Sequence, residues 1–93
     1  MIGSEVKNLR KDDLSLSRVQ FAHLLGVHPL TVYKWERGKS PPTPHQQALL
    51  ESFKKATSSQ PDIGKAVATA LVTAGVALAL FLLLNAAFGE NRR

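Results

Sequence analysis

The sequence predicts an all-α protein, in which a small four-helix domain is followed by one long apolar helix. Three observations support this fold class. Apolar residues in the first part of the chain recur at the three- and four-residue spacing of helix faces, and glycine and proline stand where helices would end or begin. Residues 66–88 contain no charged side chain. We expect the four-helix domain over 1–56, a linker over 57–65, the apolar helix over 66–88 and a polar tail over 89–93.

The first two helices are predicted from apolar spacing and from capping residues. Residues 4–12 form the first helix, with one apolar stripe. Ser17 is the predicted N-cap of the second helix, because Gln20 three residues later completes a capping box. That helix ends at Gly26, since glycine adopts a left-handed backbone at no steric cost.

Proline marks the start of the next two helices. His28 is the predicted cap of the third helix and Pro29 its first residue, where a missing N–H costs nothing. Gly38 ends this helix. Thr43 and Pro44 play the same two roles for the fourth helix.

The second and third helices have the spacing of a helix-turn-helix unit. Such a unit needs a small residue where its helices approach and a glycine at the turn. Ala22 and Gly26 supply these. The apolar positions that fix the angle between the helices hold Phe21, Leu25, Val27, Val32 and Trp35.

The run from Ser17 to Thr43 resembles the Cro/lambda-repressor (xenobiotic-response-element) family, and especially its short antitoxin-regulator-like members. In these, a Trp-Glu-x-Gly-x-x-x-Pro signature precedes a helix containing Ala-Leu-Leu, as at 35–42 and 48–50 here. The resemblance covers about residues 4–56 and implies sequence-specific binding to double-stranded DNA. One departure from the family is His28, which stands where a small hydroxyl residue is more usual.

The resemblance also implies that the third helix enters the major groove of DNA. Lys34 could donate to guanine acceptors, whereas Pro29 and Leu30 can only pack on thymine methyl groups. The expected base-contacting residues are Pro29, Leu30, Tyr33 and Lys34. The expected phosphate-contacting residues are Arg18, Thr31, Arg37 and Lys39.

Charge and composition agree with a nucleic-acid partner and argue against an enzyme. The net charge is +5, and nine basic residues face five acidic ones before residue 61, which favours a polyanionic partner. The chain has no cysteine, and its three histidines lack metal-ligand spacing. Because no catalytic constellation is present either, we expect no enzymatic activity, cofactor or metal.

The apolar run 66–88 would form a helix about 34 Å long, against a bilayer core of about 30 Å. It therefore predicts a single membrane span that leaves the chain tail-anchored, with the lipid bilayer as a partner. Three lysines precede the run and two arginines follow it, a bias toward a cytoplasmic N-terminal domain. The resulting hypothesis is a membrane-tethered transcription regulator or DNA anchor.

Two alternatives stay open for this arrangement. The chain could be a membrane-anchored scaffold whose helix-turn-helix domain binds protein, or a soluble regulator of the cytoplasm or nucleoid that oligomerises through its C-terminal helix. Either a membrane span or a soluble bundle of C-terminal helices would allow a homodimer or higher homo-oligomer, since small residues four apart let helices approach closely. The predicted helix–helix interface comprises Ala66, Ala70, Ala74, Gly75 and Ala79.

Overall fold

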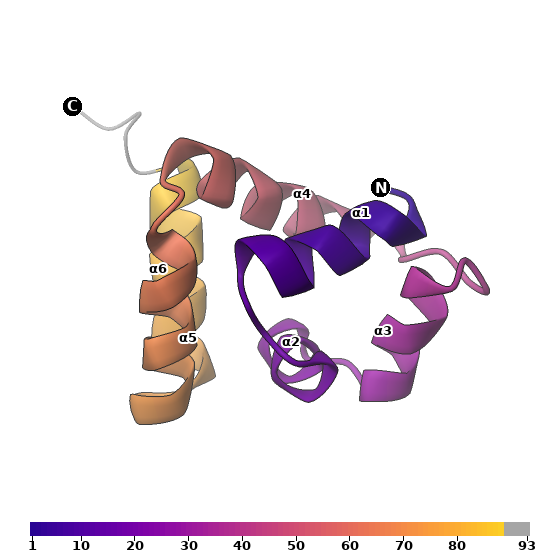
Figure 1. Ribbon diagram of the computed structural model, residues 1–93, viewed down its shortest axis with the longest axis horizontal. Helices are drawn as coiled ribbons and strands as arrows, with labels where there is room; N and C mark the ends of the chain where they lie inside the picture. Colours follow the sequence, from indigo (N-terminus) through magenta and orange to yellow (C-terminus); the bar gives the residue numbers. More distant parts are fainter. Residues whose placement is uncertain (89–93) are drawn as a thin grey trace.

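The computed structural model describes residues 1–88, and over this range all regular secondary structure is helical (Figure 1). The predicted all-α class is confirmed for these residues; the polar tail predicted at 89–93 lies outside them. The helices are α1 (Gly3–Asn8), η1 (Leu9–Asp13), α2 (Arg18–Leu25), α3 (Pro29–Glu36), α4 (Pro44–Ser59), α5 (Ile63–Thr73) and α6 (Val76–Phe88).

The predicted first helix is present as α1 and its π-helical continuation η1. The wider turn of η1 ends where the Leu14 amide donates to the Leu9 carbonyl at 3.0 Å. The start of α1 lies against the end of α3, so closely that a Cβ on Gly3 would be 2.6 Å from the Glu36 carbonyl oxygen. Glycine is therefore required at Gly3 for this contact.

The helix-turn-helix unit forms as its caps predict. Ser17 accepts a hydrogen bond from the Gln20 amide and completes a capping box, and Gly26 ends α2 in the left-handed conformation (φ 71°, ψ 31°). His28 caps α3 through Nδ1, which accepts from the Leu30 amide at 3.0 Å, and Pro29 is the first helical residue.

Helix α4 starts at the predicted cap, Thr43, and extends further than its apolar pattern predicts. Its buried side chains include Leu50, Phe53, Ala56 and Thr57. Because the helix continues to Ser59 and α5 begins at Ile63, only residues 60–62 connect the two helices, within the predicted linker 57–65.

The prediction of one long apolar helix over 66–88 is wrong. The run is interrupted at Gly75, whose φ of +107° is incompatible with an α-helix, and the Ala74 and Gly75 amides both donate to the Ala70 carbonyl. The 11 residues of α5 and the 13 of α6 span about 17 Å and 20 Å, less than the roughly 30 Å of a bilayer core.

Accordingly, no helix within residues 1–88 has both the length and the apolar character to cross a membrane. The predicted single-pass membrane location, with a cytoplasmic N-terminal domain and a tail anchor, is therefore wrong, and nothing supports the lipid bilayer as a partner. The physical reason is that the apolar run folds back at Gly75 and buries side chains against its own chain.

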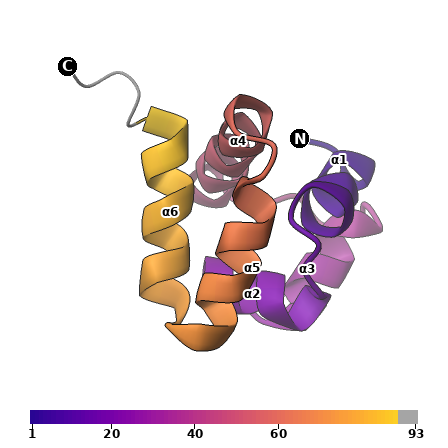
Figure 2. The ribbon, with the colours of Figure 1, turned by 60° about the vertical axis from the view of Figure 1, so that its left-hand side comes forward.

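The two helices and the turn between them form a C-terminal hairpin that packs on α4, with α6 lying against both α4 and α5 (Figure 2). The side chains of Val67, Leu83, Ala86 and Ala87 are buried there and continue the core of the first domain. At Gly64 a Cβ would overlap the Asp13 carbonyl oxygen, so α5 begins in direct contact with η1.

Candidate DNA interface

A buried ion cluster connects η1, α2 and α3 through Glu36. The Glu36 side chain is 2% exposed, and both of its oxygens accept hydrogen bonds from Arg10, at 2.6 Å from Nε and 3.2 Å from Nη2. Arg18 donates to the same carboxylate from its Nε at 3.1 Å. A buried carboxylate needs such partners, because desolvation of an unpaired charge is costly.

Arg10 is the residue of this cluster that the sequence did not single out. Its guanidinium is itself nearly buried, and Nη1 donates to the Leu16 carbonyl at 3.0 Å. The available signal was position, because Arg10 follows the buried Leu9 and lies one turn after the buried Val6. A charged residue on an apolar stripe indicates a buried ion pair, although its partner is 26 residues away.

Tyr33 lies between two arginines. The guanidinium carbon of Arg18 is 5.4 Å from the centre of the Tyr33 ring, and that of Arg37 is 5.6 Å away. Both distances are within the range of cation–π attraction. The half-buried ring therefore joins α2 to α3, and the structure brings together three predicted DNA contacts.

The other predicted contacts lie on α3 and the loop that follows. Leu30, Tyr33, Lys34 and Arg37 are spaced three and four residues apart, so they share one side of the helix end to end. Leu30, Lys34, Arg37 and Lys39 are exposed, while Pro29 and Thr31 are half-buried at the start of α3.

This surface is basic because its one acidic residue is buried. From Leu14 to Leu50 the only carboxylate in the sequence is that of Glu36, and the arginine cluster removes it from solvent. The charged side chains that remain exposed between Leu14 and Leu50 are all cationic, which suits contact with phosphates.

The residues predicted as a helix–helix interface are divided by the hairpin. Ala70 and Ala79 are buried inside it, Ala66 and Ala74 are exposed, and Gly75 forms the turn. The structure thus does not place them along one side of one helix.

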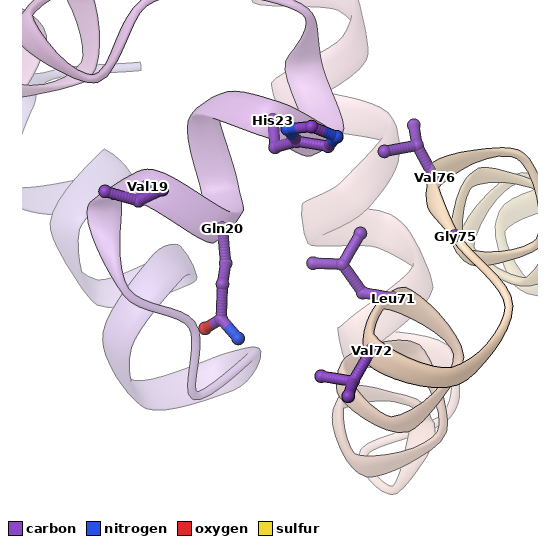
Figure 3. A pocket seen from close by; sticks show the side chains of 7 residues that line it. All are labelled: Val19, Gln20, His23, Leu71, Val72, Gly75 and Val76. Atoms are coloured by element: carbon purple, nitrogen blue, oxygen red, sulfur yellow. The ribbon is translucent and has the colours of Figure 1, made fainter.

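An open cleft of about 230 Å³ separates α2 from the tip of the hairpin (Figure 3). Val19, Gln20 and His23 line it from α2, and Leu71, Val72 and Val76 line it from the hairpin. None of the predicted DNA-contacting residues lines this cleft, so the basic surface of α3 and the contact with the hairpin are separate regions of the helix-turn-helix unit.

Comparison with protein families decides what this unit is. A model of the family described as "Helix-turn-helix" matches residues 6–51, which extend from α1 into α4. The chain belongs to the Cro/C1-type helix-turn-helix family. This is a family of DNA-binding regulators, so the resemblance seen in the sequence is confirmed. No curated protein and no solved structure was found that matches the chain.

Proposed function

We propose that this protein binds double-stranded DNA in a sequence-specific manner, with α3 as the recognition helix, and regulates transcription. The observation that supports this proposal best is the burial of Glu36 between Arg10 and Arg18. Because the Glu36 carboxylate is buried and paired, the exposed surface from Arg18 to Lys39 has cations and no acidic group that would repel a phosphate.

Base recognition is assigned to the outer side of α3. The major groove is about 12 Å wide and admits one helix. Lys34 then donates to the O6 and N7 acceptors of guanine, and Leu30 packs on a thymine methyl group. Tyr33, fixed between two guanidinium groups, presents its edge beside them.

Phosphate contacts are assigned to the flanking cations. Arg37 and Lys39 are exposed at the end of α3, and Thr31 is at its start. Arg18 uses Nε for Glu36 but leaves 43% of its side chain exposed, and a guanidinium has further N–H donors available for a phosphate oxygen. These contacts set the register of the protein on DNA.

Selection of the full chain against a pool of random duplexes, followed by fluorescence anisotropy on the enriched site, tests the proposal. Lys34→Ala should relax preference at one base pair by about 1–3 kcal/mol. Arg37→Ala should weaken binding to all sequences and reduce the salt slope by about one unit.

Lys65→Ala is the matched control, because it removes one exposed positive charge from α5, outside the helix-turn-helix unit. It should leave sequence preference unchanged. The proposal fails if no duplex is enriched at low salt, or if Lys65→Ala weakens binding as much as Arg37→Ala does.

A further inference from the structure

Helix α3 begins at an N-cap that can gain a proton. His28 has an extended backbone, and its Nδ1 accepts a hydrogen bond from the Leu30 amide at 3.0 Å. Only the neutral imidazole has a lone pair on Nδ1, since both nitrogens of the protonated ring carry hydrogen. Helices α2 and α4 begin instead at the hydroxyl groups of Ser17 and Thr43, which accept without any change of charge. The start of α3 is therefore sensitive to pH in a way that the starts of α2 and α4 are not.

His28 holds the first turn of α3 through both its side chain and its carbonyl group. The Leu30 amide donates to the ring, and the Thr31 amide donates to the His28 carbonyl at 2.9 Å. Protonation of Nδ1 removes the acceptor of the Leu30 amide and sets one N–H against another. It also places a positive charge at the positive end of the helix dipole. The neutral ring therefore stabilises the first turn, and the protonated ring loosens it.

No carboxylate within residues 1–88 forms an ion pair with His28 that would offset this charge. Helices α1 and α2 pack on α3. The two carboxylates of these three helices have other partners, because Glu5 accepts from the Ile2 amide and Glu36 is bound by two arginines. The charged or titratable side chains of the three helices are Glu5, Lys7, Arg18, His23, Tyr33, Lys34 and Glu36. Protonation of His28 thus gains no salt bridge in exchange for the lost cap.

The turn that loosens belongs to the proposed base-reading surface. Leu30 is 52% exposed and donates its own amide to the His28 cap. The proposed phosphate contacts Arg37 and Lys39 lie at the opposite end of α3, so they do not depend on this cap. A protonated ring also adds one positive charge, which attracts phosphates of any sequence. Acid should therefore weaken discrimination between sequences and not attraction to DNA as such.

We propose that sequence discrimination by this protein is regulated by pH, because α3 is fully capped only when His28 is neutral. The inference rests on the proposed DNA-binding function and concerns regulation of the same recognition helix. Its direction follows from the cap. The folded first turn favours the neutral ring, so this stabilisation is present at high pH and is lost on protonation. Histidine ordinarily changes charge between about pH 5 and 8, and specificity should decline over that range.

The inference is tested by the affinity of the full chain for two duplexes at two pH values. The duplexes are the site enriched at about pH 8 and a scrambled version, measured by fluorescence anisotropy at about pH 8 and about pH 5.5 with constant ionic strength. The ratio of the scrambled to the specific dissociation constant should fall by about fivefold at the lower pH, which is the factor expected for one N-cap. Affinity for the scrambled duplex should not fall.

His28→Ser separates the cap from its proton. Serine is a strong N-cap and its hydroxyl does not gain charge, so this variant should have the same ratio at both pH values. His28→Asn, a second cap that does not titrate, should behave in the same way. His28→Ala removes the cap, so its ratio should be about fivefold lower than that of the unaltered chain at about pH 8 and should change little with pH.

His23→Gln and His45→Gln are the matched controls, because each removes an exposed histidine from another helix. Both variants should keep the fivefold dependence on pH. The inference is overturned if the unaltered chain discriminates equally at both pH values, if His28→Ser and His28→Asn retain the dependence, or if either control abolishes it. Circular dichroism at each pH verifies that every variant is folded.

A measurement without DNA distinguishes failure of this inference from failure of the proposed function. In amide NMR spectra, the Leu30 resonance should follow the protonation of His28 in the unaltered chain and should not do so in His28→Ser. If no duplex is enriched, the proposed function fails, and the Leu30 resonance still shows whether the cap responds to pH. If a duplex is bound with the same specificity at both pH values, DNA binding stands and the regulation by His28 is refuted.

Discussion

The helix-turn-helix unit and the C-terminal hairpin are stabilised by different interactions. In the first, side chains cap both helices at Ser17 and His28, and Glu36 joins separate elements through ion pairs. In the hairpin, α5 has no side-chain cap, and apolar contacts with α4 hold α6 in place. One small core therefore combines a part stabilised by caps and ion pairs with a part stabilised mainly by apolar burial.

The largest expected effect is in the polar part. Glu36→Ala leaves Arg10 buried without its carboxylate, so the free energy of unfolding should fall by roughly 3–5 kcal/mol. Urea denaturation followed by circular dichroism measures this. Glu51→Ala, which removes an exposed carboxylate of α4, should change it by less than about 0.5 kcal/mol. Equal losses would contradict the buried cluster.

Next is the apolar part, where adjacent leucines offer a matched pair. Leu83 is fully buried and Leu84 is exposed. Leu83→Ala should lower the free energy of unfolding by about 2–5 kcal/mol. Leu84→Ala should lower it by less than about 1 kcal/mol. Because the core is continuous, Trp35 fluorescence and circular dichroism should report the same shifted midpoint. Separate transitions would show that the two regions fold independently.

The turn glycine of each region offers a further comparison, with a smaller expected loss of stability. Gly26 and Gly75 both have positive φ and open space where a Cβ would be, so substitution acts through backbone strain alone. Gly75→Ala should destabilise by about 1–3 kcal/mol, and Gly26→Ala by about 1–2 kcal/mol. Thermal unfolding measures both. A stabilised Gly75→Ala variant would contradict the turn that divides α5 from α6.

The smallest effects concern helix starts. Ser17→Ala removes a capping bond and should cost about 1 kcal/mol. Asp62→Ala, at the start of α5, removes no capping bond and should cost less than about 0.5 kcal/mol. Chemical denaturation resolves this pair, and a larger loss at Asp62 would mean that α5 is capped after all.

Sequence reasoning succeeded where signals are local. Ser17, Gly26 and Pro29 act on backbone within a few residues, so the boundaries of α2 and α3 follow from their identities. Likewise, the side of α3 that holds Lys34 and Arg37 follows from helical spacing.

It failed where the deciding partner is distant in the chain. Gly75 lies in an apolar run, and glycine is also common inside membrane helices. What distinguishes the folded-back run is the packing of α6 against α4 and α5, which spacing along the run does not reveal. Arg10 enters the sequence analysis only as one of nine basic residues, because its partner Glu36 is 26 residues away. The packing of Gly64 on Asp13 is equally non-local.

The arrangement of the molecule also has a consequence for contact with DNA. Helix α6 and α3 lie on opposite sides of a molecule whose longest dimension is 41 Å (Figures 1 and 2). A duplex bound along α3 would therefore leave α6 on the far side of the molecule, away from the phosphates.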